Sequence, residues 1–224
     1  MARLRFEIAI SADGYVAGPN QSEQHPLGEG GEQLHEWVVK LAAWRESHGR
    51  EGGEVNPSSE IIEEAMENVG AVVMGRNMFG GGPGPWGGDP WRGWWGEDPP
   101  FHVPVFVLTH HERVPLEMEG GTTFYFVTDG IESALARAAE AADGKDVRLG
   151  GGAEAAQQYL AAGLIDELQL NIVPILLGAG ERLFDNVGAD LRLEQTRVVH
   201  TPEVTHIRYR VEAGSPSAES KGGA

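Results

Sequence analysis

The sequence predicts an α/β fold in which a mixed, mostly parallel central sheet carries helices on both faces and ends in antiparallel strands. Three observations support this prediction. Short apolar strands alternate with helical segments through most of the chain. A strand leads through three glycines directly into a helix at 145–153. Two runs of alternating polar and apolar residues, 191–200 and 204–212, have the pattern of an antiparallel pair.

Length and composition favour a single domain. The chain has 224 residues, of which 41% are hydrophobic, and this is enough for one sizeable core. We assign the domain to residues 1–212. Residues 213–224 are small and polar for the most part, and we expect this tail to be disordered.

Charge and residue usage argue against several classes of protein. A net charge of −17 disfavours nucleic acid and anionic membranes as partners, because both require a basic surface. No run of about 18 apolar residues is present, so we expect no membrane span and a cytoplasmic protein. The chain has no cysteine, and its eight histidines lack the spacing of zinc ligands, so we expect no metal site.

The first elements follow from local patterns. Residues 3–10 alternate enough for a strand, and a turn-rich segment follows them. Residues 31–47 place apolar side chains at helical spacing, which predicts one amphipathic helix. Asn56 and Pro57 suit a helix cap and first turn, and they predict a second helix that ends near Asn68.

Strands and helices then alternate toward the carboxyl terminus. The segment 80–100 is rich in Gly, Pro and Trp, which forbids regular structure. Its four tryptophans form either a stacking wall for a flat heterocycle or a hydrophobic plug, and we favour the plug. Asp166 and Glu167 mark the start of a strand, where they point to opposite faces and cannot act together on one substrate. The expected elements are strands at 69–74, 103–109 and 123–127, a helix at 131–142, and a strand after Leu164 that carries Pro174.

The junction from Leu149 through Gly150, Gly151 and Gly152 to Ala153 is the most informative segment. Glycines let the backbone approach a ligand closely, and the first amides of the helix that follows have no carbonyl partners. These amides also carry the positive end of the helix dipole, so the junction predicts a phosphate-binding site. The alternative interpretation is that the glycines only make a tight turn.

Two further strand ends carry groups that suit an anion. Gly75 and Arg76 follow one predicted strand, and Thr109, His110 and Arg113 follow the next. Open α/β sheets bind ligands at the carboxyl ends of their strands. An arginine in such a place is often structural, and adjacent histidines often lie in solvated loops. Three anion-favouring strand ends in one chain nevertheless indicate a shared site.

The ordered set of motifs resembles the dihydrofolate reductase-like superfamily. It resembles more closely the reductase domain of the riboflavin-biosynthesis deaminase/reductase proteins, known as the RibD C-terminal domain, and its stand-alone relatives. The resemblance covers residues 3–211 and implies the three-layer fold of that superfamily. The matching motifs are SADGYVA at 11–17, VVMGRNMF at 72–79, VLTH at 107–110, LGGGA at 149–153 and GLIDELQLNIVPILLGAG at 163–180.

The resemblance implies that NADPH lies across the strand ends. In this family the Gly-Gly turn and the helix after it hold the pyrophosphate, and the arginine of the Gly-Arg pair lies near the adenosine phosphates. Residues after the Leu-Thr strand end surround the 2′-phosphate, and backbone groups of the first strand and its loop lie beside the nicotinamide. The implied cofactor-binding residues are Ala9, Ala17, Gly18, Gly75, Arg76, Asn77, Met78, Leu108, Thr109, His110, Arg113, Leu149, Gly150, Gly151, Gly152, Ala153 and Glu154.

Two details of the cofactor site need comment. Met78 stands where dihydrofolate reductases usually place a threonine, so a hydroxyl contact to phosphate is missing and backbone amides have to replace it. A Rossmann site fits less well, because no acidic residue follows the glycines at a strand end about 20 positions later. We predict that NADPH is preferred over NADH.

The source of the proton is left open by the sequence. The resemblance points to Asp13 in the Ser-x-Asp-Gly motif, and the segment after the nicotinamide loop offers Glu32, His35 and Glu36. The alternatives are an Asx turn for Asp13 and a solvated helix face for His35 and Glu36. Water is a further candidate. Our candidate catalytic residues are Asp13, His35 and Glu36.

The predicted function is that of an NADPH-dependent oxidoreductase, which passes a hydride to a small conjugated heterocycle, pterin-like or pyrimidine-like, or to a carbonyl substrate. The alternative is a non-catalytic member of the fold that binds a nucleotide or another flat ligand. The acidic segment 20–56 disfavours the phosphorylated pyrimidine of riboflavin biosynthesis as substrate. The resemblance also implies a homodimer, because relatives commonly pair through their C-terminal strands.

Overall fold

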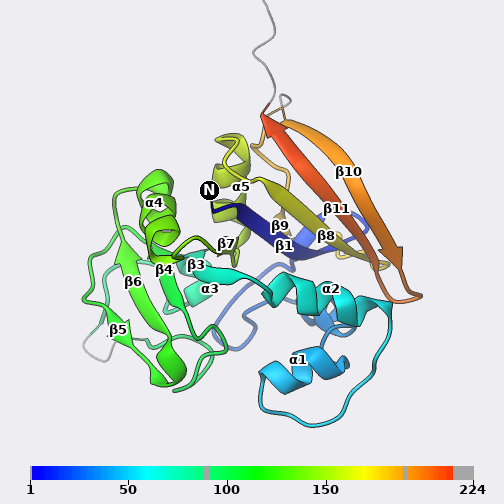
Figure 1. Ribbon diagram of the computed structural model, residues 1–224, viewed down its shortest axis with the longest axis horizontal. Helices are drawn as coiled ribbons and strands as arrows, with labels where there is room; N and C mark the ends of the chain where they lie inside the picture. Colours follow the sequence, from blue (N-terminus) through cyan, green and yellow to red (C-terminus); the bar gives the residue numbers. More distant parts are fainter. Residues whose placement is uncertain (1, 88–90, 189–190, 214–224) are drawn as a thin grey trace, which may run out of the picture.

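The computed structural model describes residues 2–87, 91–188 and 191–213 (Figure 1). Ala213 is the last residue of a strand, and the rest of the tail expected at 213–224 lies outside the described residues. Among the residues described, no helix is long and apolar enough to cross a membrane.

A nine-stranded sheet forms the centre of the molecule, in the order β10-β11-β8-β1-β7-β3-β4-β6-β5. The strands from β8 to β6 are parallel, and antiparallel pairs flank them on both sides. The predicted mixed, mostly parallel sheet is therefore confirmed. Its strands are β1 (Leu4–Ser11), β3 (Val69–Gly75), β4 (Pro104–Leu108), β5 (Leu116–Glu117), β6 (Thr123–Val127), β7 (Asp146–Leu149), β8 (Glu167–Val173), β10 (Leu191–His200) and β11 (Thr205–Ala213).

The helices cover both faces of this sheet. Two helices pack on one face, and the others lie with the long loops on the opposite face (Figure 1). The first pair is α4 (Ile131–Ala141) and α5 (Ala153–Ala161), and the others are α1 (Ala42–Ser47), α2 (Pro57–Met66) and α3 (Arg76–Phe79), with short 3₁₀ turns η1 (Gly31–His35) and η2 (Glu119–Gly121).

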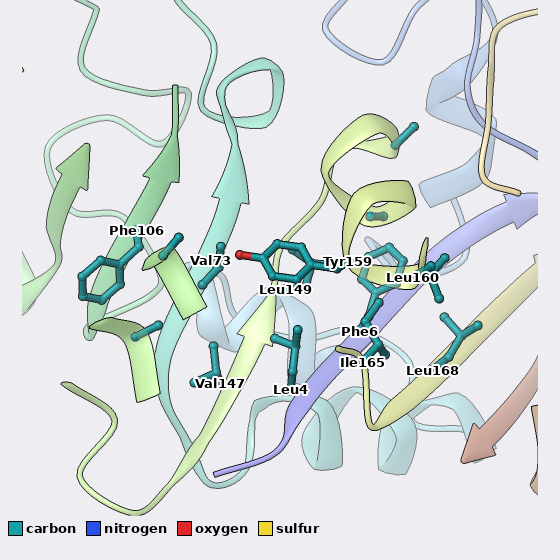
Figure 2. Close-up of a cluster of buried hydrophobic side chains, with 14 of the residues drawn as sticks. Leu4, Phe6, Val73, Phe106, Val147, Leu149, Tyr159, Leu160, Ile165 and Leu168 are labelled. Carbon is teal, nitrogen blue, oxygen red and sulfur yellow. The ribbon is translucent and has the colours of Figure 1, made fainter. Parts of the chain in front are cut away.

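The main core lies between the sheet and the helices α4 and α5, as Figure 2 shows. Phe6 of β1 and Leu149 of β7 are almost completely buried there. Tyr159 of α5 packs among them and donates its hydroxyl to Ile131 O at 2.8 Å, so its one polar group is satisfied. Each buried side chain of this size contributes about 1.5–3 kcal/mol, which fixes the position of α5 behind the glycines.

Alternation along β3 separates the two faces of the sheet. Ala71 and Val73 belong to the main core, whereas Val72 and Met74 face a second cluster beneath α3 and the tryptophan-rich segment. Trp86 packs at the edge of this second cluster. Trp91 and Trp95 pack there as well, so three of the four tryptophans form the predicted hydrophobic plug.

Helix α2 begins as its sequence predicts. The Asn56 side chain accepts a hydrogen bond from Ser58 N at 2.9 Å, and the Ser59 hydroxyl in turn accepts one from Asn56 N at 3.1 Å. This reciprocal cap satisfies two amides that the first turn would leave unpaired, and Pro57 occupies the first helical position, where its missing amide costs nothing. The helix ends at Met66, close to the expected end.

The single helix predicted for 31–47 is wrong. The segment forms the 3₁₀ turn η1, then a run of turns, and only then the six-residue helix α1. Leu41 makes an isolated parallel bridge with Glu54, and the backbone of Leu41 is extended rather than helical. The apolar spacing is still used, because Leu34, Trp37 and Leu41 are buried. A backbone contact from a distant segment therefore overrides the helical periodicity.

The sequence also missed three short strands and placed Pro174 inside a strand. β8 ends at Val173, just before the proline, because proline cannot donate to the sheet. The missed strands are β2 (Tyr15–Ala17) and β9 (Glu181–Arg182), which pair with each other in a separate two-stranded sheet, and β5 at the edge of the main sheet. Each has only two or three residues, too few to show a period.

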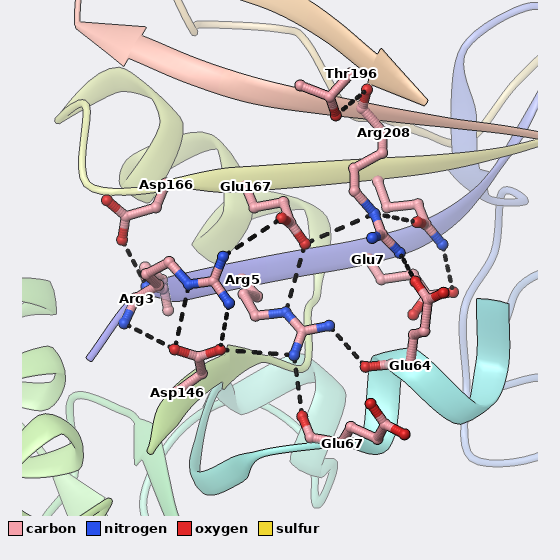
Figure 3. Close-up of polar contacts among 12 residues, drawn as sticks. Arg3, Arg5, Glu7, Glu64, Glu67, Asp146, Asp166, Glu167, Thr196 and Arg208 are labelled. Carbon is pink, nitrogen blue, oxygen red and sulfur yellow. Dashed lines mark hydrogen bonds and ion pairs between the residues drawn. The ribbon is translucent and has the colours of Figure 1, made fainter. Parts of the chain in front are cut away.

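Beneath α2, the sheet carries charged rather than apolar side chains (Figure 3). Arg208 Nη2 lies 2.7 Å from Glu64 Oε2, and Arg3 Nη2 lies 2.9 Å from Asp146 Oδ2. These contacts join α2 to strands β1, β7, β8 and β11. We call this group the arginine–carboxylate cluster, and it consists of Arg3, Arg5, Arg208, Glu64, Asp146 and Glu167.

Candidate functional site

The carboxyl ends of β3 and β7 are joined by two backbone hydrogen bonds. Gly75 N donates to Gly151 O at 2.7 Å, and Gly150 N donates to Val73 O at 2.8 Å. The triglycine turn therefore lies beside the Gly75-Arg76 pair, although the two are far apart in the chain. These are two of the three strand ends that the sequence analysis selected.

The triglycine turn leaves room for a ligand. A Cβ atom placed on Gly151 or Gly152 would meet no other atom within 4 Å, and Gly151 has a φ of +109°, which favours glycine. A Cβ on Gly150 would instead lie 3.5 Å from the Val72 side chain, so Gly150 packs on the sheet. Among the described residues, the amides of Gly151 and Gly152 donate to no backbone carbonyl. The turn thus offers both space and hydrogen-bond donors.

Helix α5 begins directly behind the turn, with Gly152 as its N-cap. The first-turn amides of Ala153 and Glu154 have no acceptor within the helix, and they add the positive end of its dipole. Ala153 is buried and the Glu154 side chain is exposed, so a ligand at the turn would meet the backbone of both residues rather than their side chains. This arrangement suits the negative charge of a phosphate.

Arg76 follows β3 and is fixed by three acceptors. Its Nε and Nη2 donate to Gly80 O at 3.1 Å and Gly81 O at 3.2 Å, and its Nη1 donates to Thr109 Oγ1 at 3.3 Å. Thr109 stands at the end of β4 and is buried, so this contact joins the third selected strand end to the other two. Two of the five N–H groups of the guanidinium are left for a ligand.

Trp86 brings a second arginine to the same place. The Arg76 Cζ lies 3.1 Å from the centre of the indole ring, and the Arg113 Cζ lies 4.7 Å from it. Arg113 Nη1 donates to Trp91 O at 2.6 Å. We call this group the arginine–indole site, and it consists of Arg76, Trp86, Thr109 and Arg113.

The arginine–indole site is an electropositive point in an acidic protein. Within the described part of the chain, neither Arg76 nor Arg113 forms an ion pair with a carboxylate. Burial lowers the pKa of Arg76, and the nearby positive charge of Arg113 lowers it further. Burial also lowers the pKa of Arg113. Neither charge is compensated by a carboxylate among the described residues, and an anion bound here would compensate both.

Several residues implied by the resemblance lie at the margin of this site. Asn77 and His110 are exposed, and Leu108 and Leu149 pack into the core. Met78 packs with the second apolar cluster, and no side-chain hydroxyl replaces the usual threonine there. These positions remain predictions.

The expected nicotinamide end is more enclosed. Ala9 is 6% exposed and packs in a third apolar cluster with Leu34 and Trp37. A Cβ on Gly18 would lie only 2.0 Å from Glu29 O, so this glycine serves a close approach between two chain segments. Ala17 is buried in β2. The role of these three positions beside a nicotinamide remains a prediction.

Asp13 has the hydrogen bonds of a structural carboxylate. Its oxygens accept from Ser11 Oγ at 2.6 Å, Leu177 N at 3.2 Å and Gly178 N at 2.8 Å. The Ser11 hydroxyl, followed by the Gly178 and Leu177 amides, lowers the pKa of Asp13 below its ordinary value. A carboxylate held in this way is a poor proton donor, so the geometry favours the turn-closing role over catalysis.

His35 and Glu36 lie in and after η1. Burial lowers the pKa of His35, and its Nδ1 is buried without a hydrogen-bond partner among the described residues. Glu36 is exposed, as is Glu32. The structure therefore separates the two candidates, since His35 points into the protein and Glu36 into solvent. Their catalytic assignment remains a prediction.

An open cavity of about 460 Å³ lies beside the N-terminus of α2. It adjoins the turn between β10 and β11, which lies near the carboxyl end of β8 because Thr205 pairs with Ile172. Two glutamates face it, and one of them, Glu203, is bound to Lys40 Nζ at 2.6 Å. The residues that line the cavity are Glu54, Asn56, Pro57, His200, Thr201, Pro202 and Glu203.

Comparison with protein families covers most of the described chain. The family model of the RibD C-terminal domain matches residues 2–207. The chain belongs to the RibD C-terminal domain family. This membership confirms the resemblance seen in the motifs. A similar protein is the uncharacterized protein YyaP of Bacillus subtilis (strain 168), which is 29% identical over 198 residues, and the match covers 86% of this chain and 85% of YyaP.

Solved structures share the dihydrofolate reductase-like fold of this RibD C-terminal domain. A putative riboflavin biosynthesis protein from Shewanella sp. PV-4 has a TM-score of 0.61 and 22% identity, and covers 95% of this chain and 99% of its own. A deaminase/reductase from Thermotoga maritima has a TM-score of 0.57 and 14% identity, over 93% of this chain and 56% of its own. Dihydrofolate reductase from Enterococcus faecalis has a TM-score of 0.50 and 13% identity, over 93% and 96%.

The contact between Trp86 and the two arginines was not predicted. From the sequence, the tryptophans are expected to form a plug or a stacking wall, and the arginines are expected to contact phosphate independently of them. No spacing signal links Trp86 to Arg76 or Arg113, because the segment 80–100 has no period. An aromatic residue among glycines and prolines, close in sequence to an arginine at a strand end, is the only hint that the chain offers.

Proposed function

We propose that this RibD C-terminal domain protein is an NADPH-dependent reductase of a small conjugated heterocycle, pterin-like or pyrimidine-like, or of a carbonyl compound. One observation carries the proposal. Three adjacent strand ends offer an open glycine turn at a helix N-terminus together with two arginines that lack carboxylate partners among the described residues. NADPH has a pyrophosphate and a 2′-phosphate, and these match the two features.

The chain's own residues would divide the binding of the cofactor. The amides of Gly151, Gly152 and Ala153 would hold the pyrophosphate, and Arg76 and Arg113 would hold the 2′-phosphate. When bound, NADPH supplies the hydride. Support also comes from a relative in fold, the Enterococcus faecalis dihydrofolate reductase, whose structure is described as complexed with NADP(H).

The proton would reach the substrate from water or from an exposed group. Asp13 accepts three hydrogen bonds, and His35 has a buried Nδ1 and a lowered pKa, so neither is a ready donor at neutral pH. Glu36 is exposed and would act only if the substrate reached it. A solvent-derived proton therefore fits the described side chains best.

The substrate is expected to lack phosphate. Glu54 and Glu203 face the open cavity beside α2, and the segment 20–56 is acidic as a whole. Lys40 offsets only one of these carboxylates. A phosphorylated pyrimidine bound beside these carboxylates would meet like charge, so we expect an uncharged heterocycle to react faster.

The test is NADPH oxidation, followed by absorbance, with a panel that includes dihydrofolate and the phosphoribosylamino-pyrimidine of riboflavin biosynthesis. The matched variants are Gly151→Val and Gly144→Val. Both glycines have a positive φ and open space around them, but Gly144 lies at the opposite end of β7. We expect Gly151→Val to weaken NADPH binding at least about 100-fold, and Gly144→Val to leave it unchanged. Equal affinities of the two variants would contradict the site.

A second candidate function is ligand binding without turnover. The observation that favours it is that Asp13 and His35, two of the three candidate acids, are unsuited to donate a proton. In that case NADPH would bind and Gly151→Val would abolish binding, but no compound of the panel would be reduced. The two measurements together therefore separate the candidates.

We also infer a homodimer. Strand β10 lies at the edge of the sheet, is ten residues long and exposes Leu193 and Val198. An exposed edge strand of this length invites pairing with another chain, and a second copy would cover it. Light scattering should give twice the monomer mass. Replacement of Val198 by lysine should shift the protein to the monomer, and a monomer in the unaltered protein would contradict the inference.

A further inference from the structure

We propose that Trp86 is a positioning residue, which holds Arg76 and Arg113 where the 2′-phosphate of the cofactor binds and thereby sets the preference for NADPH over NADH. The inference rests on the proposed function and deepens it. It gives the segment 80–100 a part in cofactor selection in addition to its packing against the second apolar cluster.

The geometry shows that the indole serves both arginines at once. The Arg76 Cζ lies 3.1 Å from the centre of the ring and the Arg113 Cζ 4.7 Å from it. The face of an indole ring attracts a guanidinium, and tryptophan does so better than the other aromatic residues. One ring therefore brings together two side chains from the ends of neighbouring strands.

Without the indole, the two arginines would lose the one ring that both of them contact closely. Their charges repel each other, and a free arginine side chain gains rotamer entropy when it leaves for solvent. Arg113 is held besides by one hydrogen bond to Trp91 O and by the Phe126 ring, whose centre lies 4.8 Å from its Cζ, whereas Arg76 has three hydrogen bonds of its own. We therefore expect the loss of Trp86 to release Arg113 first.

Trp86 is itself fixed in place before any ligand binds. Its Nε1 donates to His111 O at 3.0 Å, and its ring meets Phe126 edge-on at 5.0 Å and Phe79 at 5.9 Å. The arginines consequently rest on a rigid support. A site that is arranged in advance loses less entropy when the phosphate arrives.

The competing explanation is that Trp86 only fills space. Trp95 provides the matched control, because it belongs to the same apolar cluster and packs on Phe101 at 4.8 Å and on Phe124 at 6.0 Å. In the described part of the chain, its ring has no arginine above it. A packing defect should arise in both variants, whereas a change of cofactor preference should arise only at Trp86.

The experiment compares Trp86→Leu, Trp86→Phe and Trp95→Leu with the unaltered full-length protein. Calorimetric titration with NADPH and with NADH gives the ratio of the two affinities, and thermal unfolding reports on the fold. We expect Trp86→Leu to weaken NADPH binding about tenfold and to leave NADH binding unchanged, because NADH has no 2′-phosphate. Trp86→Phe should lower the ratio only about two- to threefold, because a phenyl ring attracts a guanidinium less strongly than an indole does, and Trp95→Leu should not change it.

Each outcome decides a separate question. An unchanged ratio in Trp86→Leu would overturn the inference and leave the proposed function standing. An unaltered protein that binds both cofactors equally would overturn the inference as well, whereas one that binds neither would overturn the proposed function itself. Should Trp86→Leu not fold, Trp86→Phe decides, because it keeps the packing: a two- to threefold fall in the ratio supports the inference, and an unchanged ratio contradicts it.

Discussion

The protein holds its arginines in two contrasting ways. In the arginine–carboxylate cluster beneath α2, Arg208 lies 2.7 Å from Glu64 Oε2 and 3.7 Å from Glu167 Oε1 (Figure 3). In the arginine–indole site, Arg76 and Arg113 contact carbonyl oxygens, one hydroxyl and an aromatic ring, with no carboxylate among the described residues. In a chain with a net charge of −17, the second arrangement is the unusual one.

The pKa shifts show the same difference between the arginine–carboxylate cluster and the arginine–indole site. Burial alone would raise the pKa of Glu64, but hydrogen bonds from Arg197 and Arg208 outweigh it and lower this pKa below its ordinary value. Burial lowers the pKa of Arg76, and the charge of Arg113 adds to that effect. Charges in the cluster are compensated from within and stabilise the fold, whereas the two arginines of the site have no carboxylate partner among the described residues.

The largest expected effect on stability comes from Arg208→Gln. Only 19% of the Arg208 side chain is exposed, and its removal leaves Glu64 without one of its two arginine partners. We expect the free energy of unfolding to fall by about 3 kcal/mol, measured by urea denaturation. NADPH affinity should not change. A loss of cofactor binding in a variant that remains folded would show that the arginine–carboxylate cluster is not separate from the cofactor site.

The second prediction concerns His206, which extends the buried polar contacts near the cluster. It is 1% exposed, and its ring nitrogens contact Asn171 Oδ1 at 2.7 Å and Ser58 Oγ at 2.8 Å. Burial, and to a smaller extent the charge of Arg197, lowers the pKa of His206 to about 4.

The sign follows from this lowered pKa. The unfolded chain takes up the proton near pH 6.5 and the folded chain only near pH 4, so stability is complete above pH 6.5 and falls between these values. From pH 7 to pH 5 this amounts to about 2 kcal/mol. His206→Gln should remove this pH dependence from the free energy of unfolding measured by urea denaturation. A pH dependence equal to that of the unaltered protein would contradict the assignment.

The variant Arg76→Gln tests the arginine–indole site. The change removes a charge-assisted contact to phosphate, so we expect NADPH to bind about thirtyfold more weakly, or about 2 kcal/mol, with little change for NADH. Stability should hold, because the arginine has no carboxylate partner to leave unpaired within the described residues. Weakening of NADPH and NADH by the same factor would show that Arg76 does not contact the 2′-phosphate.

The smallest effect is expected from Arg210→Gln. This residue lies two positions after Arg208 on β11 and pairs with Glu194, but both side chains are more than half exposed. Exposed ion pairs contribute less than about 1 kcal/mol. Urea denaturation of this variant should therefore match the unaltered protein closely. A loss as large as that of Arg208→Gln would show that burial does not separate the two pairs.

Much of the fold could be predicted from the sequence because its signals are local. The cap at Asn56, the apolar run of β3 and the glycines at 150–152 each act within a few residues of themselves. The helix predicted at 31–47 failed because its conformation depends on a distant contact, the bridge from Leu41 to Glu54. Periodicity reports which residues are buried, and it does not report which backbone they pair with.

The residues of the candidate site also differ in whether a local sequence signal marks them. The glycine turn, Arg76 and Thr109 could be selected because each follows a recognisable strand. Trp86 could not, because an irregular segment carries no signal of where its side chains will lie. The role of Asp13 depends on amides of Leu177 and Gly178, which no local pattern reveals.

Calorimetric titration of the unaltered protein, with NADPH and separately with NADH, tests whether the glycine turn before α5 and the arginine pair beside Trp86 together bind NADPH. We expect saturable binding of one NADPH per chain and at least about tenfold weaker binding of NADH. Absence of saturable binding with either dinucleotide would contradict this expectation.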